Sequence, residues 1–441
     1  MKTKDKKESK PRERMRATLR PSGRRKPNWQ EYTATVEEIQ AFLDGRVMLR
    51  YNVVTRRTEC HQLTDFGDEI PEQVLWEPIS DRLVNTLWRE LSAQKTTRIQ
   101  DVWRVIESDY VPEYDPFRFY LSRLPPWNDD LPDYIMELSL SVNVKGDSDE
   151  QILFYDYLKK WLVAMVAGWV DDTVVNNVML VLIGEQGSYK TTWFNYLLPP
   201  DLKTYFYTKT NANRMTKDDL LTLSQYGLIC CEELDTMRPA ELNQLKAAMT
   251  MPSVDERAAY ARYHEHRKHI ASFCGTGNNV QFLSDSTGNR RWLPFEVESI
   301  ESPRSSPFNY EGIYSQAFAL YRQGFQYWFS PDEIRHLARH NEAFETASLE
   351  KELIDQYFRR PEGQEPGEFL PVSMALQIVG ANITQKLSAN LLGRAFMQQG
   401  FRFKKSHGIR GYVVVRRSAE EMRVMRQVRG GADGAEGASV F

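Results

Sequence analysis

The chain has 441 residues, enough for two or three domains of ~150 residues with sizeable cores. Its net charge is −3, so neither sign dominates the molecule. The longest apolar stretch, residues 161–170, is too short to cross a bilayer, and the N-terminus lacks the apolar segment of a signal peptide. Three of the four cysteines lie in apolar, strand-like runs and suggest neither disulfides nor a zinc site. These features argue against membrane and secreted proteins and predict a cytoplasmic globular one.

Residues 1–28 predict a disordered basic tail, since residues 1–26 hold twelve Lys and Arg but few large apolar side chains. A solvated tail and an arm that contacts nucleic acid both remain open. Residues 29–149 predict a mixed, mainly helical N-terminal domain, with a hairpin near 47–58 and helices within 79–107. The acidic residues Asp129, Asp130 and Asp133 are expected to form a solvated loop.

Residues 150–300 alternate helical and strand-like segments, which predicts an α/β core with a parallel sheet. The apolar run 178–183 favours a buried central strand. Gly184 and Gly187 follow it and allow a tight turn whose N–H groups can bind phosphate. Lys190 would contact the β- and γ-phosphates of ATP, and the Thr191 hydroxyl would bind Mg²⁺. The expected nucleotide-binding residues are Gly184, Glu185, Gln186, Gly187, Ser188, Tyr189, Lys190, Thr191 and Thr192.

Tyr189 departs from the usual pattern, in which glycine precedes the lysine. A non-glycine residue can be accommodated there if it takes helical backbone angles and points its side chain outward. We therefore interpret the segment as a variant phosphate-binding loop. A glycine-containing turn with an incidental lysine is the alternative.

Two later strands are predicted to end in polar side chains. The run 228–231 has the form of a Walker B strand and leads to Glu232, the expected metal-side acid, and Glu233, the expected water-activating base. Their order could be reversed, with Asp235 taking part. The strand within 270–278 delivers Asn278, which would sense the γ-phosphate. Arg290 and Arg291 suit stabilisation of charge on that phosphate, especially from a neighbouring subunit, although a surface ion-pair cluster is also compatible.

Basic and aromatic side chains alternate between the acids and Asn278, with Tyr260 and Tyr263 interleaved. This pattern favours contact with single-stranded DNA. The expected nucleic-acid contacts of this segment are Arg257, Arg262, His264, His266, Arg267 and Lys268.

Residues 301–365 predict a helical linker region, with helices at 310–330 and 331–349. Residues 366–428 have the pattern of a winged-helix-like domain, with helices near 373–379 and 384–398 and strands at 401–405 and 412–416. Its wing would present Lys404, Lys405 and Arg410, with Arg402 and His407, to phosphates. Packing against protein is an equal alternative. Residues 429–441 predict a flexible tail.

The ordered motifs resemble those of the virulence-associated protein E family, P-loop ATPases of phages and integrative elements that are similar to superfamily 3 helicases and phage primase-helicases. The resemblance is carried by Gly184–Gly187 with Lys190 and Thr191, Glu232–Asp235, Leu245 and Lys246, Val254–Arg257 with Tyr260 and Arg262, Gly275–Asn278, and Asp285–Arg291. It implies an AAA+-like core that assembles as a ring, with a hexamer as the expected form, around DNA. It also implies Asn278 as sensor 1 and Arg290 or Arg291 as a trans-acting finger.

The resulting hypothesis is an ATP-dependent DNA helicase or translocase that acts in the replication of a mobile element, with a primase or other replication proteins as candidate partners. A nucleotide-gated DNA-binding initiator or scaffold without unwinding activity is the alternative. A P-loop phosphotransferase acting on a small acceptor is the third hypothesis, and the arginine pair argues against it.

Overall fold

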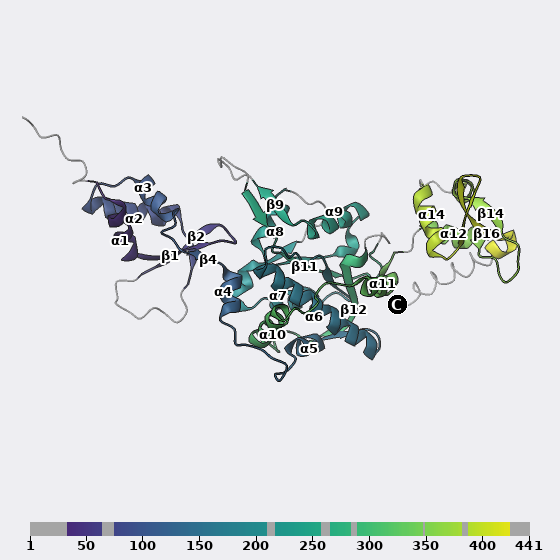
Figure 1. Ribbon diagram of the computed structural model, residues 1–441, viewed down its shortest axis with the longest axis horizontal. Helices are drawn as coiled ribbons and strands as arrows, with labels where there is room; N and C mark the ends of the chain where they lie inside the picture. The colour runs from purple at the N-terminus through teal and green to yellow at the C-terminus, as the bar shows by residue number, and fades with distance from the viewer. Residues whose placement is uncertain are drawn as a thin grey trace, which may run out of the picture. The chain divides into compact units, whose positions relative to one another are not determined.

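The computed structural model describes residues 33–63, 75–209, 217–256, 265–283, 289–346, 349–381 and 387–423. The predicted tails 1–28 and 429–441 lie outside these residues. The chain divides into two compact units, Met1–Pro116 and Phe117–Phe441 (Figure 1). The first unit therefore ends earlier than the predicted boundary at residue 149.

The first unit combines three helices with a small sheet. Its elements are α1 (Val36–Asp44), β1 (Val47–Asn52), β2 (Arg57–Gln62), β3 (Glu77–Pro78), α2 (Asp81–Gln94), α3 (Ile99–Ile106) and β4 (Glu113–Tyr114). The strand order is β3-β2-β1-β4, and β1 and β2 form the predicted hairpin. Apolar residues at helical spacing on α1, α2 and α3 pack together into a core that includes Val47 of β1. The predicted helices within 79–107 are confirmed.

Residues after Pro116 belong to the second unit because they pack onto its central sheet. They form α4 (Pro116–Ser122), α5 (Tyr134–Leu140), the short strand β5 (Val142–Val144) and the long helix α6 (Ser148–Val170). β5 pairs with the edge of the sheet. The middle of α6 is buried on all sides, and the Trp161 indole donates a hydrogen bond to the backbone oxygen of Phe273, 3.0 Å away.

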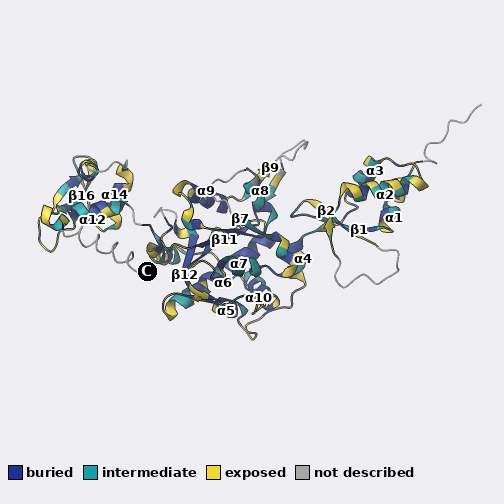
Figure 2. Ribbon diagram, turned by 180° about the vertical axis from the view of Figure 1, so that it is seen from behind, coloured by how far each residue is buried: buried dark blue, intermediate teal, exposed yellow. Residues whose placement is uncertain are grey.

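The central sheet has six strands in the order β5-β12-β6-β11-β8-β7. Five of them run parallel: β6 (Met179–Ile183), β7 (Phe206–Lys209), β8 (Leu228–Cys231), β11 (Ser272–Gly277) and β12 (Trp292–Ile300). Every residue of β6, β8 and β11 is buried, as expected for parallel strands that are covered on both faces (Figure 2). The predicted parallel α/β sheet is present.

Helices from several parts of the sequence pack against this sheet. Alternate residues of β6, β8 and β11 share a core with α8 (Lys217–Gln225) and α9 (Pro239–Met249). The same strands also contact α6 and α7 (Lys190–Leu197). The four cysteines are buried, with Cys60 on β2 and the other three within β8 and β11.

The region predicted as a helical linker packs on this core. It contains α10 (Tyr310–Arg322), α11 (Pro331–His340) and the short 3-10 helix η5 (Asn341–Phe344). α10 ends at Arg322, well before the predicted end at residue 330, and α11 ends before the predicted residue 349. Gln316 and Asn341 are 0% exposed, so this region is an integral layer of the second unit.

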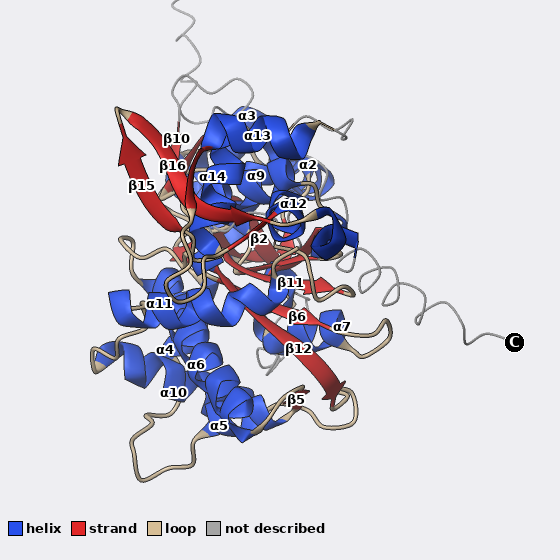
Figure 3. Ribbon diagram, turned by 90° about the vertical axis from the view of Figure 1, so that its right-hand side faces the viewer, coloured by secondary structure: helices blue, strands red, loops and turns tan. Residues whose placement is uncertain are grey.

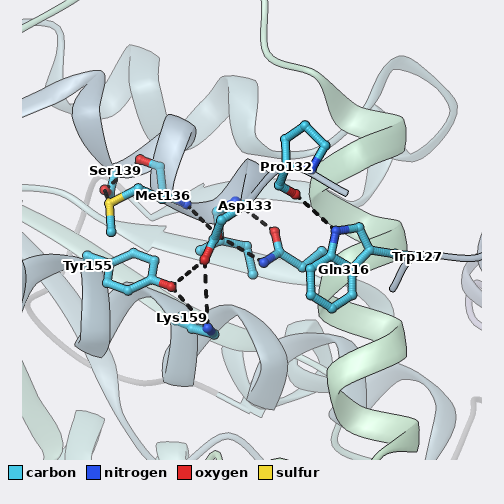
Figure 4. A network of polar contacts seen from close by, with 9 residues as sticks. Trp127, Pro132, Asp133, Met136, Ser139, Tyr155, Lys159 and Gln316 are labelled. Carbon is cyan, nitrogen blue, oxygen red and sulfur yellow. Dashed lines mark hydrogen bonds and ion pairs between the residues drawn. The ribbon is translucent and has the colours of Figure 1, made fainter. Parts of the chain in front are cut away.

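Asp133 connects three helices, which corrects the expectation that it lies in a solvated loop (Figure 4). Its carboxylate caps α5 by accepting the Met136 N–H at 2.9 Å. It also accepts hydrogen bonds from the Tyr155 hydroxyl of α6 at 2.5 Å and the Gln316 amide of α10 at 2.9 Å. Lys159 lies 3.9 Å away. Burial alone would raise the pKa of Asp133, but these hydrogen bonds and the lysine hold it below its ordinary value.

The C-terminal region has its own apolar core. It contains α12 (Leu349–Tyr357), β13 (Phe358–Arg359), β14 (Glu368–Pro371), α13 (Val372–Gly380), α14 (Ala389–Gln398), β15 (Arg402–Ser406) and β16 (Ile409–Arg416). β16 pairs with the other three strands, and its hairpin with β15 is drawn as red arrows in Figure 3. The predicted helices and hairpin strands are found here, and the region begins at Leu349 instead of 366.

Candidate nucleotide-binding site

Three adjacent parallel strands bring the predicted site together at their carboxyl ends. β11 lies between β6 and β8, with Gly277 paired to Ile183 and Gly275 paired to Cys231. The loop 184–189 follows β6, the acids follow β8, and Asn278 follows β11. Ligands of open α/β sheets bind at this edge. Although the acids and Asn278 are far apart in sequence, the strand order makes them neighbours of the loop.

Close packing explains one glycine of the loop, and backbone conformation explains the other. The Gly184 N–H donates to the Gly277 oxygen at 3.2 Å, and a Cβ on Gly184 would lie 2.9 Å from the Val297 oxygen. Gly187 has a φ of +88°, a conformation that L side chains rarely adopt. The loop then enters α7 at Lys190, where the first N–H groups of a helix have no acceptor within the helix. A helix start of this kind attracts anions.

Lys190 holds its ammonium inside the loop. The residue is only 7% exposed, and Nζ donates to the backbone oxygens of Gly184 at 2.7 Å and Glu185 at 2.6 Å. It also donates to the Ser188 hydroxyl at 3.1 Å. Burial lowers the pKa of Lys190, and the nearby Asp235 opposes that change. The Lys190 ammonium is therefore held inside the loop. A bound phosphate would take the place of the loop oxygens as its hydrogen-bond acceptor.

Tyr189 corrects one detail of the sequence interpretation. Its φ of 62° and ψ of 11° are left-handed, whereas helical angles were expected. The chain reverses direction immediately before α7, and the backbone adopts glycine-like angles although the residue is tyrosine. The side chain is 47% exposed and points outward, as expected.

The acids after β8 occupy different surroundings. Glu232 is half-buried, and its N–H donates to the Lys209 oxygen at 3.3 Å. Glu233 is exposed and has left-handed backbone angles, with φ 54° and ψ 44°. Both residues directly follow β8, at the same end of the parallel strands as the loop.

Asp235, in the segment after β8, forms two hydrogen bonds with the segment after β11 that carries Asn278. Its Oδ1 accepts the Asn278 N–H at 3.2 Å, and its Oδ2 accepts the Asn279 N–H at 3.1 Å. This arrangement favours a positioning role for Asp235 over the metal or base role considered from the sequence. No local sequence pattern indicates the contact, because the partners are 43 and 44 residues apart.

The residues present suit a magnesium nucleotide. Thr191 lies in the first turn of α7, and Glu232 directly follows β8. A hydroxyl and a carboxylate are the hard oxygen donors that Mg²⁺ prefers, and Mg²⁺ usually takes its remaining ligands from water and phosphate. Thr191 and Glu232 would hold the ion, which would offset negative charge on the phosphates.

The arginine pair lies at the amino ends of the parallel strands, whereas the loop lies at their carboxyl ends. Arg290 and Arg291 belong to the 3-10 helix η4 (Asn289–Arg291), immediately before Trp292, which pairs with Met179 at the start of β6. The loop follows the other end of β6, about 13 Å away at the usual rise per residue. Neither arginine has a carboxylate partner in the part of the chain that the structure describes. Burial, and then the neighbouring Arg290, lower the pKa of Arg291.

The basic segment forms a hairpin of β9 (Ser253–Glu256) and β10 (Glu265–Lys268). The predicted contacts Arg257, Arg262 and His264 lie outside the described residues, as do Tyr260 and Tyr263. Lys268 forms an ion pair of 3.2 Å with Asp172, and His266 lies 2.6 Å from Asp255 on the opposite strand. Lys268 therefore anchors the base of the hairpin. Arg267 is half-buried beside it.

The hairpin of β15 and β16 presents the other predicted cations. Lys405 lies opposite Arg410, and Lys404 precedes it on β15. Each of Arg402, Lys404, Lys405, His407 and Arg410 is exposed. Among the described residues, no carboxylate forms an ion pair with Lys404, Lys405 or Arg410.

The comparison with protein families agrees with these motifs. Residues 141–346 match the model of the virulence-associated protein E-like domain. This segment, just under half of the chain, is therefore similar to that domain. Its limits run from the edge strand β5 to the residues just after η5, so they include the α10 and α11 region that the sequence interpretation had separated from the core.

Three solved structures of the NrS-1 C-terminal region resemble the chain. The apo structure of residues 305–718 is 13% identical, with a TM-score of 0.47, and the similarity covers 86% of this chain and 98% of that one. Two A-form apo structures have TM-scores of 0.44 and 0.46 at 13% and 14% identity, with the same coverage. No curated protein matches the chain. No helix among the described residues is long and apolar enough to span a membrane.

Proposed function

We propose that this chain is an ATP-dependent DNA helicase or translocase that acts in the replication of a phage or other mobile element. The observation that carries the proposal is the meeting of the Lys190 loop, the acids Glu232 and Glu233, and Asn278 at one edge of the parallel sheet. These are the groups that hydrolysis of ATP requires: a phosphate cradle, acids for metal and water, and a polar contact for the γ-phosphate. The virulence-associated protein E-like domain spans all of them.

Each group has a distinct role in this proposal. Lys190 and the N–H groups at the start of α7 bind the β- and γ-phosphates. Glu233, which is exposed at the sheet edge, orients and deprotonates the attacking water. Asn278 directs its amide to the γ-phosphate. Thr191 and Glu232 hold Mg²⁺.

The arginine pair supports a ring-shaped oligomer, for which a hexamer is the expected form. Arg290 and Arg291 lie at the amino edge of the sheet, remote from the loop of their own chain. In a head-to-tail ring the amino edge of one copy can face the carboxyl edge of the next. The pair would then stabilise the charge that develops on the γ-phosphoryl group of the neighbouring copy. DNA would pass along the β9 and β10 hairpins.

The first test is ATP hydrolysis by the purified protein with and without single-stranded DNA. We expect DNA to accelerate turnover, and Lys190→Ala to reduce kcat/KM at least about 100-fold because the charge on the phosphates is lost. Lys95→Ala is the matched control, since it removes an ion pair of 2.7 Å with Glu38 in the first unit. The proposal would be refuted if the Lys190→Ala variant hydrolysed ATP as fast as wild type, or if single-stranded DNA did not accelerate hydrolysis.

The second candidate is a nucleotide-gated DNA-binding initiator or scaffold. It is supported by the exposed cations Lys404, Lys405 and Arg410, which suit duplex phosphates without any unwinding step. A strand-displacement assay separates the two functions. The helicase should displace a strand with ATP and lose this activity in Glu233→Gln, whereas the initiator should bind DNA in an ATP-dependent way and displace nothing.

A further inference from the structure

One buried amide holds the backbone on both sides of the arginine pair. Asn341 follows α11 and is 0% exposed. Its Nδ2 donates to the Asn289 oxygen at 2.7 Å and to the Trp292 oxygen at 3.0 Å. Because these two carbonyl groups flank Arg290 and Arg291, a single side chain fixes both ends of the short segment that carries the pair.

A second contact holds the same segment from the side. Asn289 is 4% exposed, and its Nδ2 donates to Glu345 Oε1 at 2.8 Å. The other Glu345 oxygen accepts a hydrogen bond from Lys351 Nζ at 3.1 Å. The backbone around Glu345 is itself paired with Leu283, through Leu283 N–H to Phe344 O and Thr346 N–H to Leu283 O, both at 2.9 Å. Glu345 therefore acts from a fixed main chain.

The residues that precede Asn341 are also anchored. His340 Nε2 lies 2.8 Å from Glu150 Oε1 on α6. The His340 ring packs against Phe295 and Phe344, with ring centroids 5.1 and 5.4 Å apart. Asn341 and Glu345 thus extend from a segment that is bound to the helix and the sheet of the core.

We infer that Asn341 and Glu345 are positioning residues for Arg290 and Arg291. The inference rests on the proposed function, in which the pair acts on the nucleotide of a neighbouring copy. The arginines have no carboxylate partner among the described residues, so the backbone beneath them sets where they project. A group that stabilises charge across a subunit boundary must be held close to its working position before the reaction begins.

The test compares steady-state kinetics and complementation between variants. Asn341→Ala should reduce kcat by about 100-fold, the usual effect of a displacement of ~1 Å, and leave KM nearly unchanged because the nucleotide loop is intact. Mixed with Lys190→Ala, it should regain ATPase activity. The Lys190→Ala copies would supply well-placed arginines to the intact loops of the Asn341→Ala copies.

Matched variants separate this role from simple destabilisation. Asn176 is also a buried asparagine, 3% exposed, whose amide donates to the Trp161 oxygen and the Ser272 hydroxyl, both at 3.1 Å. Asn176→Ala should lower the melting temperature without creating a kcat defect that mixing repairs. Glu345→Gln, which keeps an acceptor for Asn289, should retain more activity than Glu345→Ala. If Asn341→Ala does not fold, Glu345→Ala carries the test, with the same expected recovery on mixing.

Arg291→Ala mixed with Lys190→Ala is the reference. If that mixture recovers activity and the Asn341→Ala and Glu345→Ala mixtures do not, the positioning role is overturned while the proposed function stands. If the Arg291→Ala mixture fails to recover, both the trans arrangement and the positioning role are overturned. A wild-type protein without ATPase activity would refute the proposed function itself.

Discussion

Two non-glycine residues of the candidate site have left-handed backbone angles, Tyr189 with φ 62° and Glu233 with φ 54°. Such conformations cost about 1–3 kcal/mol and persist where surrounding structure enforces them, which occurs most often at functional sites. At Tyr189 the demand comes from the turn into α7, and at Glu233 from the turn out of β8. Tyr189 directly precedes Lys190, which would contact phosphate, and Glu233 is itself the proposed base for the attacking water.

The strain at Tyr189 predicts an unusual order of stabilities. Tyr189→Ala keeps the left-handed conformation and should be about 1 kcal/mol less stable than Tyr189→Gly, which adopts it freely. Gly187→Ala is the control for backbone strain alone, because a Cβ there meets nothing within 4 Å but φ is +88°. Chemical denaturation of the three variants measures the difference. An alanine variant as stable as the glycine variant would show that position 189 is not strained.

The residue types of the loop predict its chemistry, but the contacts that position them are not visible in the sequence. Lys190 follows a glycine-containing loop, and the structure places its ammonium against the loop oxygens of Gly184 and Glu185. The angles of Tyr189 depend on how β6 and α7 meet, and the bonds of Asp235 join segments more than forty residues apart. Asn341 gives still less signal, since an isolated asparagine after a helix is common in ordinary caps.

The order of the strands in the central sheet is the main feature of the secondary structure that could not be predicted from the sequence. Apolar runs predict β6, β8 and β11, but only the structure shows β11 inserted between the other two. β5 and β7 are as short as β8 or shorter but lack its continuous apolar run, since Asn143 interrupts β5 and β7 ends in Thr208 and Lys209, so the sequence interpretation does not include them. The predicted linker region 301–365 contains the expected helices, but the burial of Gln316 on α10 could not be predicted because its partners, Asp133 and Ile135, are more than 180 residues away in the sequence.

The Asp133 network predicts a pH-dependent contribution to stability. The pKa of Asp133 is lowered in the folded state, so its contribution is present above the unfolded-state value of about 3.9 and is lost as pH falls through the folded value. Asp133→Asn should cost about 1–2 kcal/mol at pH 7, a figure reduced by screening because the side chain is 37% exposed. Thermal unfolding from pH 7 to pH 3 measures it.

The gap in free energy of unfolding between wild type and Asp133→Asn should narrow below about pH 4, because protonation removes the charge that Tyr155 and Gln316 stabilise. Asp130→Asn, which changes an exposed carboxylate in the same loop, should leave stability unchanged. A gap that widens in acid would mean that the pKa of Asp133 is raised in the folded state instead of lowered.

At the scale of the whole molecule, the candidate machinery is divided between two edges of one sheet. The loop lies at the carboxyl edge and the arginine pair at the amino edge, and the two residues that position the pair come from the layer after α11. The two compact units divide at Pro116, so this layer and the edge strand lie in the same unit as the loop, and the family match across residues 141–346 includes all three.

This division predicts that turnover depends on protein concentration. A single copy would bind nucleotide but lack an arginine at its own loop, so ATPase activity per molecule should fall on dilution as oligomers dissociate. Light scattering on the same samples identifies the assembled species. Arg291→Ala should assemble normally yet remain slow at every concentration. Activity per molecule that is constant while the oligomer dissociates would rule out a shared site.

The separation of loop and arginine pair also has a genetic consequence. If each nucleotide site takes its arginines from the next copy, a subunit with defective arginines inactivates the nucleotide site of the neighbouring wild-type subunit. In a cell that carries both alleles, a change at Arg291 or Asn341 should therefore behave as a dominant trait. In an enzyme that works alone, the same loss would be recessive.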